Sequence, residues 1–111
     1  MTKFTPTVNT TIYDSIGDQP VTWVPPGTVV YDKVTVTGGA GIPTGTVDFT
    51  VFTKKADCTG PSNTETKTLV AGVARSSNFA TPNKPISYKA HYNGDANYDP
   101  ADGACEALAV N

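Results

Sequence analysis

Apolar and polar side chains alternate along short stretches of this chain, and clusters of Gly, Pro, Asn and Asp separate the stretches. Alternation with a period of two places every second side chain on the same face, which is the pattern of a strand that buries one face. The clearest case is residues 46–52, where Val47, Phe49 and Val51 alternate with polar residues. The other stretches that predict strands are residues 8–13, 21–24, 28–37, 66–70, 73–79, 85–92 and 106–110.

The pattern predicts an all-β fold, an antiparallel sandwich of seven or eight strands with no helix longer than one turn. Threonine is abundant, and β-branched residues pack well on a pleated surface. Short strands separated by turn residues at regular spacing are typical of a sandwich or a barrel. The residues expected to face inward and form the core are Val34, Val36, Val47, Phe49, Val51, Tyr88, Ala90, Tyr92, Leu108 and Val110.

Two features interrupt the strand pattern. Asp32 lies on the otherwise valine-rich face of residues 28–37, so it is either held by a local hydrogen bond or marks a β-bulge that resets the face. Pro25 and Pro26 follow residues 21–24, and proline cannot donate to a strand ladder. We therefore expect residues 21–24 to form a sheet edge or a crossover.

Length and charge limit the classes of protein that fit. A chain of 111 residues forms one domain, and folding should remove roughly 65% of its surface from water. We assign residues 1–5 to an N-terminal linker and residues 6–110 to the domain. No apolar run approaches the roughly 20 residues that span a bilayer, so we expect no membrane insertion. A net charge of −2 without a cluster of Lys and Arg argues against nucleic acid as a partner.

Two segments resemble the bacterial Ig-like repeat domains. Residues 42–49 read I-P-T-G-T-V-D-F and are similar to the P-T-G-T-V-x-F that opens a major strand of these domains. Residues 88–98 read Y-K-A-H-Y-N-G-D-A-N-Y and resemble their Y-x-A-x-Y-x-G-D-x-N-Y hallmark. The end of the chain, residues 105–110, is similar to their closing strand, so the resemblance covers residues 6–110. It implies an Ig-like sandwich.

The resemblance also implies a role and a location. Members of this family are usually tandem repeats in large bacterial surface or secreted proteins, which implies a monomeric, non-catalytic spacer or stalk module with neighbouring Ig-like repeats as partners. An adhesin-type module that binds a host or surface glycan or protein is the alternative. The start of the chain has no apolar signal-peptide segment, so an extracellular or cell-surface protein would be represented here by an excerpt.

The resemblance places a corner tyrosine at Tyr88, whose hydroxyl would bond to nearby backbone. The alternative is that Tyr88 and Tyr92 are ordinary core aromatics. Ala90 stands where antibody-type domains have their second core cysteine, and Phe49 is expected to replace the buried tryptophan. The chain is therefore not expected to be an antibody-type domain.

Cys58 and Cys105 are the two cysteines. An even pair in an exported repeat suggests a disulfide, and the long loop that it closes would be worth about 4 kcal/mol. The bridge requires residues 54–58 to run back along the sheet, and two buried or free thiols are the alternative. Two cysteines and one histidine at these separations lack the ligand spacing of a metal site.

Oxygen-bearing side chains alternate in residues 95–103, as they do in a calcium loop. Pro100 stands at the sixth position, where such a motif has a glycine, so the loop departs from the calcium-loop pattern. The alternative is that the acidic and amide groups bond to the backbone of a tight turn. We expect no other cofactor. The candidate calcium ligands are Asp95, Asn97, Asp99 and Asp102, to which a domain junction would add Asp14 and Asp18.

We predict no enzymatic activity. His91 is the only histidine, it falls on the solvent face of its strand, and no nucleophile motif accompanies it. Glu65 and Glu106 are the only glutamates available for paired-carboxylate chemistry. An internal isopeptide bond, for which Lys33 and Glu106 are conceivable members, is a further alternative.

Three aromatic residues are candidates for an exposed contact surface: Trp23, Tyr31 and Tyr98. Amphipathic rings favour interfaces, so together they predict a patch for sugar or protein. The alternative is that they plug the ends of the sandwich.

Overall fold

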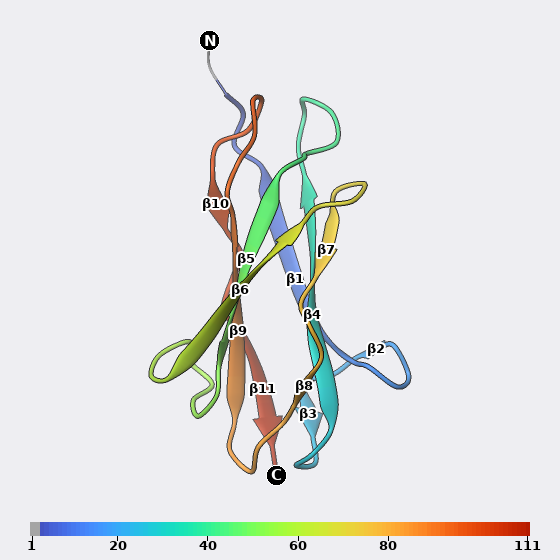
Figure 1. Cartoon of the computed structure of the whole chain (residues 1–111), viewed down its shortest axis with the longest axis vertical. Coiled ribbons are helices and arrows are strands. Elements are labelled where there is room, and N and C mark those ends of the chain that lie inside the picture. The colour runs from blue at the N-terminus through green and yellow to red at the C-terminus, as the bar shows by residue number, and fades with distance from the viewer. Residues whose placement is uncertain (1–2) are drawn as a thin grey trace.

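The computed structural model describes residues 3–111, which contain eleven strands and no helix. Figure 1 shows two sheets that run along the length of an elongated body. No helix in the described part of the chain has the length and apolarity to cross a membrane. The strands are β1 (Thr7–Asp14), β2 (Gln19–Pro20), β3 (Trp23–Val24), β4 (Val29–Thr37), β5 (Thr46–Phe52), β6 (Ser62–Thr68), β7 (Val73–Arg75), β8 (Phe79–Ala80), β9 (Ile86–Tyr92), β10 (Ala101–Asp102) and β11 (Glu106–Val110).

The strands form two sheets that pack face to face. The first sheet has the order β2-β1-β4-β7, and β8 also pairs with β4. The second sheet has the order β3-β11-β9-β5-β6, and β10 also pairs with β9. The predicted all-β sandwich is confirmed. It has more strands than expected because β2, β3, β8 and β10 are two-residue pieces at the ends of longer pairings, and β3 pairs with β11 in parallel.

The inward residues form two core clusters along the length of the sandwich. Of the ten residues expected in the core, nine are buried and Val51 is half-buried. One cluster contains Phe49, Ala90 and Tyr92, and the other contains Tyr88, Leu108 and Val110. Period-two alternation on facing strands therefore fills the space between the sheets.

Two strands lie elsewhere than the pattern indicates. β6 runs from Ser62 to Thr68, so it begins four residues earlier and ends two residues earlier than the strand expected over residues 66–70. Its side chains are mostly exposed because it is the edge of the second sheet, so it carries no apolar alternation. Residues 73–79, expected as one strand, are divided into β7 and the start of β8, because the Ser76 amide bonds to the Asp32 carbonyl between them.

The first described residues are tied to the end of the sandwich. The Phe4 amide donates to the Asn97 carbonyl, and the Phe4 carbonyl accepts from the Asp99 amide. The Phe4 ring also meets the Tyr98 ring edge to face at 6.4 Å. Residues 1–2 of the expected linker lie outside the described residues, and the chain is paired with the domain from Phe4 onward.

Candidate functional site

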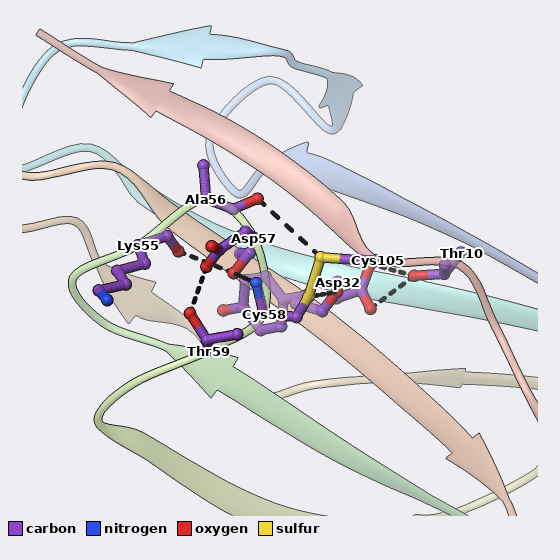
Figure 2. The surroundings of a disulfide bond; sticks show 10 residues. Thr10, Asp32, Lys55, Ala56, Asp57, Cys58, Thr59 and Cys105 are labelled. Atoms are coloured by element: carbon purple, nitrogen blue, oxygen red, sulfur yellow. Dashed lines mark hydrogen bonds between the residues drawn. A yellow bond between two sulfur atoms is a disulfide. The ribbon is translucent and has the colours of Figure 1, made fainter.

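A disulfide joins Cys58, in the loop between β5 and β6, to Cys105 at the start of β11. The two Cα atoms are 6.1 Å apart and the cysteines are separated by 47 positions. Ser87 supports the bridge, because its hydroxyl donates to the Lys55 carbonyl at 2.8 Å and accepts from the Cys58 amide at 2.9 Å. Figure 2 shows this loop folded back over the strands toward Cys105, which is the path that the bridge requires.

A buried acidic group lies beside the bridge (Figure 2). Asp32 is fully buried, and both carboxylate oxygens lie 2.6 Å from the Thr10 hydroxyl. The Asp32 amide donates to the Ser76 hydroxyl. The register between β1 and β4 is continuous through this position, so there is no bulge. Hydrogen bonds hold Asp32, as the other alternative expected, but their partners lie 22 and 44 positions away instead of being local groups. Burial raises the pKa of the Asp32 carboxyl to about 7, because the low-dielectric interior disfavours the charged form.

The residues proposed as calcium ligands form a turn and a hydrogen bond to His91 instead of gathering into one donor set. Asp95 accepts from the amides of Asn97 and Tyr98 with one oxygen, and from the Thr44 amide and hydroxyl with the other. The amide of Thr44, with the other donors, lowers the pKa of Asp95 to about 2. Asp102 lies 2.7 Å from Nδ1 of His91.

Within residues 3–111 no three His, Cys, Asp or Glu side chains are placed to hold a metal ion. Asp14 and Asp18 lie at the turn between β1 and β2, where Asp14 accepts from the Ile16 amide. In Figure 1 this turn projects from the lower part of the body, away from the loop before β10. The expected calcium set is therefore not brought together.

The bond from a tyrosine hydroxyl to backbone that was predicted for Tyr88 is made instead by Tyr92 and Tyr98, to backbone far away in the sequence. The Tyr92 hydroxyl donates to the Thr44 carbonyl at 2.7 Å. The Tyr98 hydroxyl donates to the Gly41 carbonyl at 2.6 Å and accepts from the Ala40 amide at 2.7 Å. Among the described residues, these are the tyrosine hydroxyls that bond to backbone. Tyr88 is a buried core aromatic, as the alternative interpretation of this residue expected.

The patch predicted from Trp23, Tyr31 and Tyr98 does not form. Tyr98 is fully buried at the end where the chain enters, packed against Gly38. Trp23 is 53% exposed on the edge strand β3, where its indole N–H donates to the Asn111 side chain. Tyr31 belongs to the other sheet and is buried. The three rings thus occupy three separate places.

Tyr31 instead stacks on Tyr13 across β1 and β4 on the outer surface of the first sheet. The two rings are nearly parallel, with an interplanar angle of 6° and centroids 5.5 Å apart. The Arg75 guanidinium lies 3.6 Å from the centre of the Tyr31 ring, and the Lys33 ammonium lies 5.6 Å from the centre of the Tyr13 ring. We call these four residues the tyrosine face.

The charges on the tyrosine face are arranged unusually. Lys33 and Arg75 are direct cross-strand partners, and like charges in that position destabilise a sheet. Neither makes an ion pair with a carboxylate in the described part of the chain. The Tyr31 hydroxyl donates to Asp18 at 2.9 Å, and burial, with this bond, raises the pKa of that hydroxyl. Arg75 also donates to the Asn78 side chain.

The other candidate groups are dispersed. Glu65 accepts from the amide and hydroxyl of Ser77 and pairs with Lys67 on the edge strand β6. Glu106 is half-buried on β11, which belongs to the same sheet but lies on the far side of β9 and β5. Lys33 faces outward on the other sheet, so it does not meet Glu106 as an isopeptide bond requires.

Sequence reasoning missed Tyr13 and Arg75 as members of a surface cluster. In residues 8–13 Tyr13 falls on the polar side of the alternation. An aromatic residue on that side was the available signal of a surface cluster. That Tyr13 meets Tyr31 depends on the register between β1 and β4. The register is set when the strands pair, so the local sequence pattern did not reveal this contact.

No family model, curated protein or solved structure matches this chain. The resemblance to bacterial Ig-like repeat domains stays a prediction that rests on residues 42–49 and 88–98.

Proposed function

We propose that this domain is a non-catalytic spacer module of a large bacterial cell-surface or secreted repeat protein. The observation that carries this proposal is the placement of the first described residues and of the last strand, β11. The body measures 48 × 28 × 18 Å, and in Figure 1 the segment that leads into β1 lies at one end of the long axis while β11 ends at the other. Copies joined through such ends extend by one body length each.

Stiffness along the chain supports a spacer role. The disulfide ties the β5–β6 loop to the last strand, and Asp95 ties the 95–98 turn to Thr44. Disulfides persist in oxidising environments outside the cytosol, so the bridge fits a module that is exported. A cross-link between distant parts of the chain also limits local opening under load.

Exposed apolar side chains at the entry end support contact with a neighbouring module. Phe4 is 52%, Ile42 70% and Val70 74% exposed. The Phe4 ring lies against Gly39, and the Ile42 side chain lies near Gly72, next to the Val70 turn. Large exposed apolar groups that gather in one region mark contact surfaces.

The test is the length of tandem fusions. Two and three copies are joined directly through residue 111 and residue 3, and small-angle X-ray scattering gives their maximum dimensions. We expect each added copy to lengthen the particle by about one long axis, 48 Å. Fusions with a flexible Gly/Ser linker are the control, because such linkers behave as random coils. Directly joined copies that are no more extended than the linker fusions would overturn the proposal.

Ligand binding is a second candidate function, and the tyrosine face favours it. An adhesin-type module needs a surface with charged groups that are not neutralised by an ion pair within the domain. Lys33 and Arg75 are cross-strand cations for which no described carboxylate forms an ion pair, although both also contact a tyrosine ring.

A further inference from the structure

We propose that the tyrosine face binds an acidic saccharide, with the carboxylate or sulfate of the sugar between Lys33 and Arg75. This inference rests on the second candidate function, ligand binding, and is independent of the spacer role. It is carried by the arrangement of four residues on the outer side of the first sheet, where Arg75 is exposed, Tyr13 and Lys33 are half-buried, and the buried Tyr31 ring lies beneath Arg75.

The two cations provide the anion subsite. Lys33 and Arg75 face each other across β4 and β7, on a chain whose net charge is −2. Their repulsion is unrelieved by any ion pair within residues 3–111. An anion between them replaces that repulsion with two charge-assisted contacts, and a planar guanidinium binds a carboxylate or sulfate through two parallel hydrogen bonds.

The side chains are held in place before a ligand arrives. The Arg75 guanidinium is stacked on Tyr31 at 3.6 Å and bonded to Asn78 at 3.0 Å. Tyr31 is fixed by its stack with Tyr13 and by its bond to Asp18. Because these rotamers are already restricted, binding loses less side-chain entropy than it would with free surface cations.

The surroundings of the cations select a sugar. Asp18 and Asn78 offer acceptors for hydroxyl groups, and Thr11 lies directly across from Lys33 on β1. The half-buried Tyr13 ring adds amphipathic surface next to these polar groups, while the buried Tyr31 ring supports Arg75 from below. A nucleic-acid site contacts many phosphates through many Lys and Arg side chains. This face has only two cations and also carries the carboxylate of Asp18, so it does not fit nucleic acid.

The experiment titrates the intact protein with defined oligosaccharides and follows binding by calorimetry and by NMR shifts. The probes are a hyaluronan hexasaccharide, which carries carboxylates, a heparin-derived hexasaccharide, which also carries sulfates, and neutral cellohexaose. We expect one or both acidic sugars to bind, with shifts at Tyr13, Lys33 and Arg75. Cellohexaose should bind at least about tenfold more weakly. The comparison of the two acidic probes distinguishes carboxylate from sulfate recognition.

Variants locate the site. Lys33→Gln and Arg75→Gln should each weaken binding about tenfold, the loss expected for one charged hydrogen bond, and Lys33→Arg should retain it. Lys89→Gln is the matched control, because Lys89 is an exposed lysine on strand β9 of the other sheet. Thermal unfolding of each variant checks that it is folded. If Arg75→Gln does not fold, Lys33→Gln still tests the site, because it changes no core residue.

Three results would overturn the proposal. The first is no binding of either acidic sugar at millimolar concentration. The second is an equal loss of affinity in Lys89→Gln and Lys33→Gln, which would indicate non-specific charge attraction. The third is tighter binding of a hexaglutamate peptide than of either sugar, which would assign the face to an acidic protein segment. None of these results bears on the tandem-fusion measurement, so failure here and failure of the spacer proposal are separable.

Discussion

The Thr10 hydroxyl lies 2.6 Å from both carboxylate oxygens of Asp32 in the interior of the sandwich, although the two residues are 22 positions apart. Their strands pair side by side, with Ile12 directly opposite Asp32. The contact explains how an acidic residue is accommodated on a face that otherwise buries valines. A buried polar group without such a partner would be costly.

This buried carboxyl predicts a pH dependence of stability. The pKa of Asp32 is about 7 in the folded protein and close to 3.9 in an unfolded chain, so between these values the folded state binds more protons than the unfolded state. Stability therefore falls as the pH rises from about 4 to about 7. The full effect of this group is on the order of 4 kcal/mol.

Urea unfolding at several pH values measures this dependence. Asp32→Asn should remove most of the slope between pH 4 and pH 7, because the amide does not titrate. Asp99→Asn, which changes an exposed acidic residue, should keep the slope. An unchanged slope in Asp32→Asn would assign the dependence to other groups.

Removal of the disulfide should destabilise the domain without changing its fold. Replacing Cys58 and Cys105 by serine releases a cross-link between residues 47 positions apart, which corresponds to about 4 kcal/mol in the chain-entropy model. The urea midpoint of the double variant should fall while its circular dichroism spectrum stays that of a β protein. Wild type under reducing conditions serves as the chemical control. An unchanged urea midpoint in both the double variant and the reduced wild type would contradict this prediction. It would indicate that the bonds of Ser87 are sufficient to hold the β5–β6 loop.

Asp95 should stabilise the domain through its turn, and calcium should add nothing. Its two oxygens accept four hydrogen bonds from Thr44, Asn97 and Tyr98, so Asp95→Ala should lower the melting temperature. Because the pKa of Asp95 is lowered to about 2, its contribution is present above pH 4 and is lost as the pH falls toward 2. A ligand selective for the folded state raises the melting temperature. A higher melting temperature in millimolar calcium would contradict this prediction and would support calcium binding by the candidate ligands in residues 95–102.

Gly38→Ala should be destabilising because of the buried Tyr98 ring. A Cβ at Gly38 would overlap that ring, which is anchored at its hydroxyl by Ala40 and Gly41. Overpacking of this kind costs about 1–3 kcal/mol. Gly39→Ala is the matched control, because its Cβ would meet only the Phe4 ring at ordinary contact distance. Equal effects of the two substitutions on the urea midpoint would contradict this account.

The alternation of side chains was sufficient to predict the fold class and the inward positions, because it is a local property of each strand. Phe49, Tyr92 and Leu108 lie in the interior as the alternation indicates. The position of β6 was not predictable in this way, since an exposed edge strand has no apolar face to produce the pattern.

The partners of individual side chains were decided only by the tertiary structure. Tyr13 and Tyr31 stack, and Lys33 opposes Arg75, because β1, β4 and β7 pair in one register. A slip of one residue would turn every one of these side chains to the other face. Alternation therefore determines which way a side chain points, while the register, a long-range property of packed strands, determines what it meets.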